Sequence, residues 1–501
     1  QACGSRWHSS TSHLHTELSI MTPLAVLMLA CAPYLASAVL VIAQPQAKAP
    51  YWPNKGGDLN HSGFARFTAP FDLSKPTWVF EEPRRPEKGE RNPVMKVFHS
   101  SPVIDGDFNI YIQSTTGFVY SLDKRGELRW EFETSSGNPG NVALDGSGVY
   151  TVSDDGTVFA IDAATGRELW RNKVAQHAPD DTHSLTVVDG TVLTACNFKA
   201  EVSLNDAVCA LRASDGTLKW TYSMREASGR KDAMATNQMH SIVDGNVIFT
   251  DGFGAIFSVS LADGKENWHT QNVTSMLTIK QTNGMFPYGT TASGVVGNSG
   301  LVYNPFNLQG GGKGTVRAHS AKDGSLVWQR NFDLETNVAV AAGKLQPSGR
   351  SVIVVPMGKN PNPMAMNPQE AQLFKLGVLK PVPNRVMALD ANTGETVWTF
   401  TTPTWDGRCA GSLVTLSGSG DLCAPDNFGM PTIGADGTVY LNWSGGHAFA
   451  VRDTDGDGVV NILDPKEVSS YHHGYGANGA TALAPGFAVA PSCRQLLAWS
   501  A

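Results

Sequence analysis

One pattern of apolar and polar positions recurs six times along the chain. In each copy an alternating apolar strand leads into a polar turn that contains a glycine four residues before a tryptophan. The copies end at Trp130, Trp170, Trp220, Trp268, Trp328 and Trp398, and their glycines are Gly126, Gly166, Gly216, Gly264, Gly324 and Gly394. Alternation with a period of two predicts half-buried β-strands, and glycine suits a tight hairpin turn because it tolerates positive φ. The tryptophan predicts a large flat contact between neighbouring units.

A second strand pair, joined by an Asp-Gly turn, precedes these segments. Examples are the residues 100–112, 184–195 and 241–250. Each repeat therefore holds four short strands, which is the content of one propeller blade.

Two further repeats are degenerate. The segment that begins at Thr432 has Val460 where the tryptophan belongs, and residues 481–499 lack a fourth strand. Residues 77–80 have the sequence of that missing strand, so we expect the two ends of the chain to pair in one blade. Closure of this kind removes open sheet edges, which invite aggregation. The sequence thus predicts an all-β fold: an eight-bladed β-propeller of four-stranded antiparallel blades over residues 50–501.

The N-terminal segment differs from the repeats. No charged residue lies between Glu17 and Lys48, and residues 19–43 are almost entirely apolar. This length suits a membrane anchor or a signal peptide, and small residues at 36–38 and 41–43 provide cleavage sites. The pattern predicts that residues 1–48 are a leader and that the protein is secreted or membrane-anchored, outside the cytoplasm. A buried core helix is the alternative.

Charge and cysteine content narrow the function classes. The net charge is −7 with no long Lys/Arg run, which excludes the clustered basic face of a nucleic-acid-binding protein. Export permits disulfides, and two local bridges are predicted: Cys196 with Cys209, and Cys409 with Cys423. Cys493 would remain single. Free buried cysteines are the alternative.

The pattern A-x-D-x-x-T-G-x-x-x-W, clearest at residues 160–170 and 388–398, resembles the tryptophan-docking repeat of quinoprotein alcohol dehydrogenases. Trp52-Pro53, followed by residues 57–63, is similar to a lead-in found in this wider superfamily of PQQ-repeat β-propellers. The resemblance covers residues 50–501. It implies the propeller fold, but the superfamily includes both PQQ-dependent dehydrogenases and cofactor-free scaffolds, such as the bacterial outer-membrane barrel-assembly lipoprotein. Fold alone therefore does not decide activity.

The chain departs from the dehydrogenases where their chemistry lies. Those enzymes resemble one another in an adjacent Cys-Cys pair above the cofactor, and this chain has no such pair. The catalytic Asp and the calcium-binding Glu and Asn of that family have no matching positions, and there is no C-x-x-C-H haem motif. The departures disfavour quinone chemistry.

An acidic loop follows the third strand of the seventh repeat. Its sequence, beginning at Asp453, matches the D-x-D-x-D-G calcium pattern, with oxygen ligands at alternate positions and glycine at the sharp bend. Three carboxylates so close would repel one another without a cation. The predicted ligands are Asp453, Asp455, Asp457, Asn461, Asp464 and the backbone carbonyl of Val459. An acidic turn without metal is the alternative.

Polar residues also begin several inner strands, where a propeller places them around the mouth of its central channel. The predicted cofactor-binding residues there are His99, His183, His240, Asn427 and Asn478. Converging histidines can bind a metal or move protons. The alternative is a set of hydrogen-bonded residues that line the channel.

Together these features favour an exported propeller that binds a ligand or a protein without quinone chemistry. Its expected partner is a protein, a glycan or a small molecule at the channel mouth, with calcium in the acidic loop and membrane anchoring through residues 19–43. The alternative function is a PQQ- and calcium-dependent alcohol or sugar dehydrogenase, for which PQQ would be the cofactor. A third hypothesis is a hydrolase or lyase that uses the channel histidines. No catalytic residue is assigned.

Overall fold

The computed structural model describes residues 48–83, 98–137, 140–178, 183–197, 205–235, 238–273, 293–307, 313–358, 384–405, 409–410 and 427–501. The chain divides into residues 1–46 and residues 47–501, and every described residue belongs to the second unit. The predicted leader and anchor therefore lie outside the described residues. Within the described part, no helix is long and apolar enough to cross a membrane.

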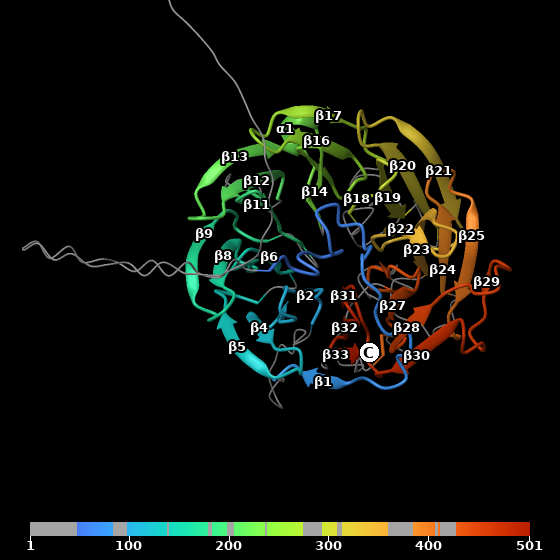
Figure 1. Ribbon diagram of the computed structural model, residues 1–501. Coiled ribbons are helices and arrows are strands. Elements are labelled where there is room, and N and C mark those ends of the chain that lie inside the picture. Colours follow the sequence, from blue (N-terminus) through green and yellow to red (C-terminus); the bar gives the residue numbers. More distant parts are fainter. Residues whose placement is uncertain are drawn as a thin grey trace, which may run out of the picture. The chain divides into compact units, whose positions relative to one another are not determined.

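Eight antiparallel sheets form the blades of a closed ring, which confirms the predicted eight-bladed propeller (Figure 1). Blade 1 consists of β2 (Val103–Ile104), β3 (Ile110–Gln113), β4 (Phe118–Leu122) and β5 (Leu128–Glu133). Blade 2 consists of β6 (Ala143–Asp145), β7 (Gly148–Val152), β8 (Thr157–Asp162) and β9 (Glu168–Lys173). Blade 3 consists of β10 (Thr186–Val188), β11 (Thr191–Cys196), β12 (Ala207–Arg212) and β13 (Leu218–Ser223), followed by the short helix α1 (Met224–Ser228). Blade 4 consists of β14 (Ser241–Val243), β15 (Asn246–Thr250), β16 (Ile256–Ser260) and β17 (Glu266–His269).

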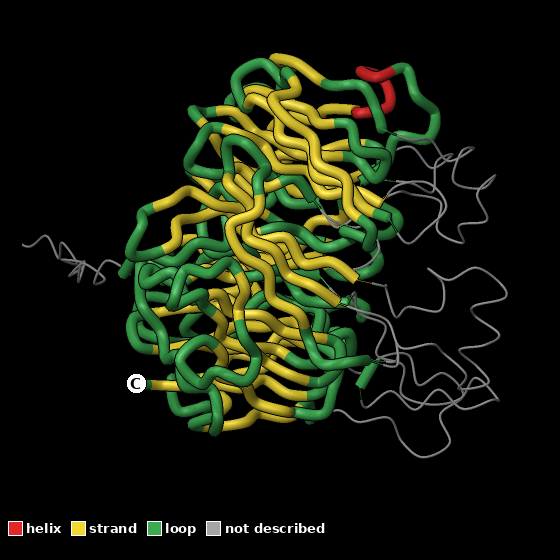
Figure 2. Tube along the Cα trace, turned by 90° about the vertical axis from the view of Figure 1, so that its right-hand side faces the viewer, coloured by secondary structure: helices red, strands yellow, loops and turns green. Residues whose placement is uncertain are grey.

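The other four blades complete the ring. Blade 5 consists of β18 (Val295–Val296), β19 (Leu301–Asn307), β20 (Gly314–Ser320) and β21 (Leu326–Phe332). Blade 6 consists of β22 (Ala341–Leu345), β23 (Arg350–Gly358), β24 (Asn384–Asp390) and β25 (Thr396–Thr401), with β29 (Val459–Val460) added at its edge. Blade 7 consists of β26 (Thr432–Ile433), β27 (Val439–Trp443), β28 (His447–Val451) and β30 (Val468–His472). Blade 8 consists of β31 (Ala482–Ala484), β32 (Phe487–Pro491), β33 (Gln495–Ser500) and β1 (Trp78–Glu81). The strands span the thickness of the ring, and turns lie at its two ends (Figure 2).

The tryptophan of one blade packs on the glycine turn of the next blade. A Cβ atom added to Gly216 would lie 2.5 Å from the ring of Trp170, and Trp170 Nε1–H donates to the carbonyl oxygen of Ala213 at 2.8 Å. The same kind of bond is made by Trp78, Trp130, Trp220 and Trp328. The neighbouring indole therefore requires glycine at this position, in addition to the backbone φ of 72°.

Both chain ends build blade 8, as predicted. Strand β1 pairs antiparallel with β33, and Trp78 lies opposite Ala498. This is the register in which Trp170 lies opposite Ala160 in blade 2. A Cβ atom on Gly126 would lie 2.6 Å from the Trp78 ring, so the docking contact passes from blade 8 to blade 1.

Blade 7 corrects one expectation. The position opposite Ala450, where other blades carry tryptophan, holds Ser469 and not the predicted Val460. Val460 instead lies in β29, which pairs in parallel with β25 of blade 6. The acidic loop between β28 and β30 is long enough to reach the neighbouring sheet and add a strand to it. Trp398 of blade 6 is only 1% exposed beneath this cover.

The lead-in segment lies inside the ring (Figure 1, blue). Its backbone carbonyls accept hydrogen bonds from the N–H groups of the innermost strands at 2.7–3.3 Å. The donors are Ile104, Leu144, Ile242, Val296, Ala342 and Ile433, and the acceptors are Trp52, Pro53, Leu59, Asn60, Ser62 and Gly63. Residues 52–63 therefore satisfy inner edges that a bare channel would leave open.

The disulfide prediction is half right. Cys196 and Cys209 are bonded across β11 and β12, as expected from their place in one hairpin. The predicted bridge between Cys409 and Cys423 is wrong, because Cys409 is a free buried thiol. Cys493, expected to be single, is disulfide-bonded. Cys423 lies outside the described residues.

The docking contact predicts that Gly216→Ala lowers stability more than Gly190→Ala does. Both glycines have positive φ in blade 3, but nothing lies within 4 Å of a Cβ on Gly190. Gly190→Ala should cost about 1–2 kcal/mol for backbone strain alone, and Gly216→Ala about 1–3 kcal/mol more for the clash with Trp170. Urea unfolding measures both values. Equal losses in the two variants would show that the ring contact adds nothing.

Candidate functional site

The residues that begin the inner strands form a hydrogen-bonded belt around the axis of the ring. Ala480 N–H donates to Ser101 Oγ at 2.8 Å, and Ser101 N–H donates to Asn141 Oδ1 at 2.6 Å. Asn141 then donates to the carbonyl oxygen of His183 through its N–H at 2.8 Å and its Nδ2–H at 3.1 Å. The belt links blade 8 to blade 3 through buried groups, so these polar residues hold neighbouring blades in register.

The belt continues into blades 4 and 5. Ser184 N–H donates to the carbonyl oxygen of Gln238 at 3.2 Å, and Met239 N–H donates to Ser293 Oγ at 3.0 Å. The polar residues that precede the inner strands therefore use some of their atoms in hydrogen bonds between blades. Only their side-chain atoms that make no such bond are available to bind a ligand.

All five predicted cofactor-binding residues are buried in the ring. His99 is 2% exposed, His183 and His240 are fully buried, and Asn427 and Asn478 are 1% and 6% exposed. The structure brings His183 and His240 together, with ring centroids 6.4 Å apart. No comparable contact places His99, Asn427 or Asn478 beside this pair among the described residues. Their role in binding a cofactor stays a prediction.

His61, which the sequence analysis did not select, completes a histidine cluster. Its Nδ1 lies 2.5 Å from the carbonyl oxygen of Lys55, and its Nε2 lies 2.8 Å from Thr186 Oγ1. Because a carbonyl only accepts, Nδ1 carries the proton and Nε2 accepts from the Thr186 hydroxyl. The lead-in segment therefore adds a third imidazole on the axis.

Burial keeps this cluster neutral. Desolvation lowers the pKa of His61 to about 4 and that of His183 to about 3, and the charge of Lys55 acts in the same direction on both. The pKa of His240 is also well below its ordinary value, because of burial first and the two other histidines second. The Nδ1 atoms of His183 and His240 have no hydrogen-bond partner among the described residues. These two nitrogens are the atoms through which the cluster could bind a ligand.

Asn141 could have been found from the sequence. It lies five residues before Gly146, as His240 lies five residues before Gly245. His61 had no such signal, because it belongs to the lead-in and reaches the axis only when the ring closes around that segment.

The acidic loop of residues 452–467 brings together Asp453, Asp455 and Glu467. Their carboxylate oxygens lie within 4.8 Å of one another, and this is the single group of its kind among the described residues. Of the other predicted ligands, Asp457 accepts Val459 N–H at 2.7 Å and Asp464 accepts Lys466 N–H at 2.8 Å. The structure does not place these two carboxylates in the close group.

Glu467 is a further candidate ligand that the calcium pattern missed. It lies beyond the roughly 12-residue span of an EF-hand loop, and it is only 2% exposed. Burial alone would raise the pKa of Glu467, but N–H donors from Asn461 and Thr454 outweigh burial and hold it below its ordinary value. These backbone donors thus stabilise the anionic form of Glu467 beside Asp453 and Asp455.

The hydrogen bonds of the loop also pre-form its bend. Asp453 accepts Gly456 N–H through Oδ1 at 2.8 Å and Gly458 N–H through Oδ2 at 3.2 Å. The loop replaces the glycine–tryptophan turn of blade 7 and attaches to β25 of blade 6. A cation held here would fasten two blades to each other, which is a structural role.

Comparison with known proteins confirms the resemblance to PQQ-repeat propellers. A family model described as outer membrane protein assembly factor BamB matches residues 115–278. The chain is 24% identical over 261 residues to the outer membrane protein assembly factor BamB of Yersinia pestis, covering 49% of this chain and 60% of that protein. It is 24% identical over 236 residues to the tetrathionate hydrolase of Acidithiobacillus ferrooxidans, covering 46% of this chain and 43% of that protein. The matches thus span about half the length of these curated relatives.

Solved structures share the fold. BamB from Moraxella catarrhalis superposes with a TM-score of 0.54 at 12% identity, covering 86% of this chain and all of that one. The quinohemoprotein alcohol dehydrogenase from Comamonas testosteroni superposes with a TM-score of 0.55 at 13% identity, covering 90% and 80% of the two chains. At these identities the likeness concerns architecture alone.

We expect calcium to bind the acidic loop and raise the melting temperature. At a free concentration of 100 times Kd, binding to the folded state adds about 2.7 kcal/mol. Asp455→Asn should remove the effect, whereas Asp323→Asn, in the exposed turn of blade 5, should not. Calorimetric titration and thermal melts in calcium or EGTA measure both. Absence of binding heat together with equal melting temperatures would contradict the site.

The histidine cluster predicts loss of stability in mild acid. Because the folded-state pKa of His61 is about 4 and the unfolded-state pKa is about 6.5, the unfolded chain binds more protons between these values. Stability is therefore complete above pH 6.5 and falls as the pH drops, with His61 alone accounting for about 3 kcal/mol by pH 4. His61→Gln should make the stability measured by urea unfolding fall less steeply between pH 6.5 and pH 4. An identical slope in the His61→Gln variant would contradict the assignment.

Proposed function

We propose that this chain, a β-propeller of the PQQ-repeat type, is an exported protein-binding module without quinone chemistry. The family model described as outer membrane protein assembly factor BamB carries this proposal, because it matches the region in which the repeat is most regular. The first curated relative has the same description. By analogy, the chain binds other proteins during assembly steps outside the cytoplasm.

The chemistry of the axial residues supports a binding role over a dehydrogenase role. A PQQ-type centre would pair an anionic quinone with calcium, and calcium prefers several oxygen ligands, carboxylates above all. The predicted and observed axial side chains are imidazoles and amides: His61, His99, Asn141, His183, Gln238, His240, Asn427 and Asn478. This set contains no carboxylate and does not fit the calcium of such a centre.

The lead-in supports the same conclusion. Residues 52–63 lie inside the ring and bond to six inner strands, so this backbone takes up space that a ligand would otherwise have. An outer surface is then the larger area available for contact. The outer strands of blades 1, 3 and 5 expose Leu128, Leu218 and Leu326, each by about half (48%, 46% and 53%).

These three positions allow a direct test. A photo-crosslinking residue placed at Leu128, Leu218 or Leu326 in the full chain, in its own cells, should give a discrete protein adduct at one or two of these positions and not at all three. A partner of ordinary size covers about 800 Å² and cannot reach all blades at once. Leu463, 87% exposed on the acidic loop, is the control for random collision. Mass spectrometry of the adducts identifies the partner.

A matched measurement addresses the dehydrogenase alternative. Purified chain mixed with PQQ and calcium should show no change in quinone absorbance and no dye-linked oxidation of alcohols or sugars. Two results together would contradict the proposal and support a dehydrogenase: quinone binding with turnover, and protein adducts that are no more frequent at the three leucine positions than at Leu463.

A further inference from the structure

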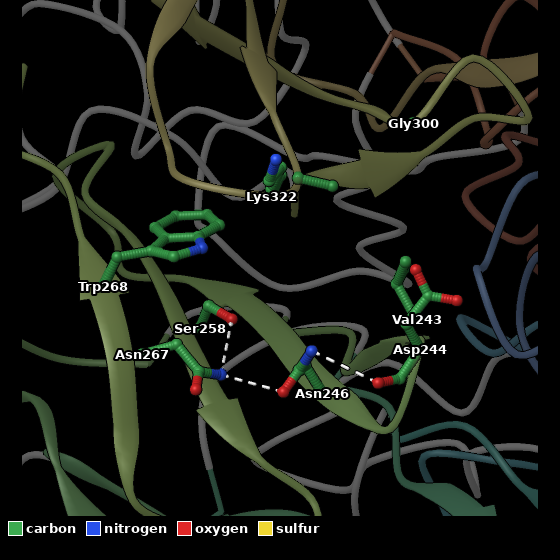
Figure 3. Close-up of a pocket in the computed structure, with 9 residues that line it drawn as sticks. Val243, Asp244, Asn246, Ser258, Asn267, Trp268, Gly300 and Lys322 are labelled. Carbon is green, nitrogen blue, oxygen red and sulfur yellow. Dashed lines mark hydrogen bonds between the residues drawn. The ribbon is translucent and has the colours of Figure 1, made fainter.

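A cavity of about 400 Å³ opens between blades 4 and 5. Blade 4 contributes Asp244 and Asn246 at the turn from β14 to β15, Ser258 of β16, and Asn267 and Trp268 of β17. Blade 5 contributes Lys322 from the turn before β21 (Figure 3). This volume falls in the range of about 300–1,000 Å³ that is typical of small-molecule sites.

The cavity coincides with a break in the docking contact between blades. Trp268 still packs on the next turn, since a Cβ on Gly324 would lie 2.6 Å from its ring. In contrast to Trp220 and Trp328, however, its Nε1–H donates to no acceptor in the described part of the chain. Figure 3 shows this indole nitrogen pointing toward the other lining residues.

The residue two strands further in differs as well. In blades 1, 2 and 5 a tyrosine of the second strand packs beside the docking tryptophan, with ring centroids 5.7–6.1 Å apart. Those residues are Tyr111, Tyr150 and Tyr303, and their hydroxyls reach the same carbonyl as the indole at 3.0–3.5 Å. In blade 4 the corresponding register position holds Ile248. Trp268 therefore lacks the tyrosine contact. Blade 3 also has an aliphatic residue there, Leu193, and Trp220 keeps its bond to Leu261, so the missing tyrosine does not by itself explain the unpaired indole N–H.

A row of polar side chains faces the indole. Asn267 Nδ2–H donates to Asn246 Oδ1 at 2.9 Å and to Ser258 Oγ at 3.2 Å, which fixes the orientation of both amides (Figure 3). The Asn267 carbonyl oxygen then remains as an acceptor, and the Ser258 hydroxyl hydrogen as a donor. The cavity therefore offers both a hydrogen-bond donor and an acceptor that are not already bonded to each other.

The charges at the rim balance. Asp244 carries one negative charge and Lys322 one positive charge, and both side chains are exposed. A net-neutral site with mixed hydrogen-bonding groups favours a neutral ligand over an anion or a cation. The balanced charges also argue against recognition of a ligand through its net charge.

We propose that this cavity binds one pyranose ring of a neutral carbohydrate. Hydroxyl groups of a sugar both donate and accept, which matches the Asn267 oxygen, the Ser258 hydroxyl and the Trp268 N–H. The face of an aromatic ring carries partial negative charge and attracts the C–H face of a sugar. The cavity lining includes neither the axial histidines nor Leu128, Leu218 and Leu326, so the inference goes beyond the proposed protein-binding function.

The test uses the full folded chain and three probes: the methyl glycosides of glucose, galactose and mannose. Saturation-transfer NMR and calorimetric titration measure their binding. Trp268→Phe keeps a ring on Gly324 but removes the N–H, and Asn267→Ala removes the acceptor. Each should weaken the best-bound probe about fivefold, as expected for one hydrogen bond. Trp220→Phe, the equivalent change between blades 3 and 4, is the matched control and should leave affinity unchanged.

Stability separates a binding role from a structural one. Both variants lose part of an indole that packs on a glycine, but Trp220→Phe also loses a 2.9 Å bond to the carbonyl oxygen of Leu261. It should therefore lower the melting temperature more than Trp268→Phe does. Failure of all three glycosides to bind, or equal affinity in Trp268→Phe and the wild type, would overturn the proposal. If Trp268→Phe instead abolishes the photo-crosslinked protein adduct, the cavity belongs to the protein partner and the carbohydrate assignment is wrong. Loss of glycoside binding alone leaves the protein-binding proposal intact.

Discussion

The contact on which the ring depends is an indole lying flat on the glycine of the next blade. It joins sheets that share no backbone ladder, and it requires two things of one residue: positive φ and the absence of a Cβ atom. The Nε1–H bond to a turn carbonyl fixes the direction of the ring, as at Trp170 and Ala213. The contact recurs at the turn glycines Gly126, Gly166, Gly216, Gly264, Gly324 and Gly394. Pairing of β1 with β33 ends the series without a free sheet edge.

A second constraint acts on the inside of the ring. Short inner strands leave N–H groups facing the axis, and a protein interior does not tolerate unpaired donors. The lead-in provides carbonyls for six of these strands, and the polar belt joins their first residues from blade to blade. Much of what looks like a ligand site in sequence is therefore occupied by structural bonds. Among the buried atoms without a hydrogen-bond partner in the described residues, His183 Nδ1 and His240 Nδ1 belong to imidazoles that burial keeps neutral.

Chemistry on this ring appears where the repeat is broken. Blade 7 replaces the glycine–tryptophan turn by an acidic loop, which reaches blade 6 and gathers Asp453, Asp455 and Glu467. In blade 4 the Nε1–H of Trp268 reaches no acceptor among the described residues, and a cavity lies beside this indole. In both places part of the usual inter-blade contact is missing, and polar groups remain. Departures from an internal repeat are thus more informative about binding than the repeat itself.

The sequence by itself determined the architecture. Local alternation, turn glycines and tryptophan spacing specified the blades, because each blade is a local unit of consecutive hairpins. Even the pairing of residues 77–80 with the C-terminal strand followed from counting strands. The Cys196–Cys209 bridge was equally local, since both residues lie in one hairpin.

Contacts between residues distant in sequence were decided only by the tertiary structure. Spacing gave no indication that Cys409 is free and Cys493 bonded, that Ser469 and not Val460 takes the tryptophan position, or that Glu467 joins the acidic group. The approach of His61 to His183 and His240 likewise needs the closed ring, and so does the cavity beside Trp268. The physical reason is common to all of these: hydrogen-bonding partners and free space depend on how neighbouring blades meet, and a single chain segment encodes only its own hairpin.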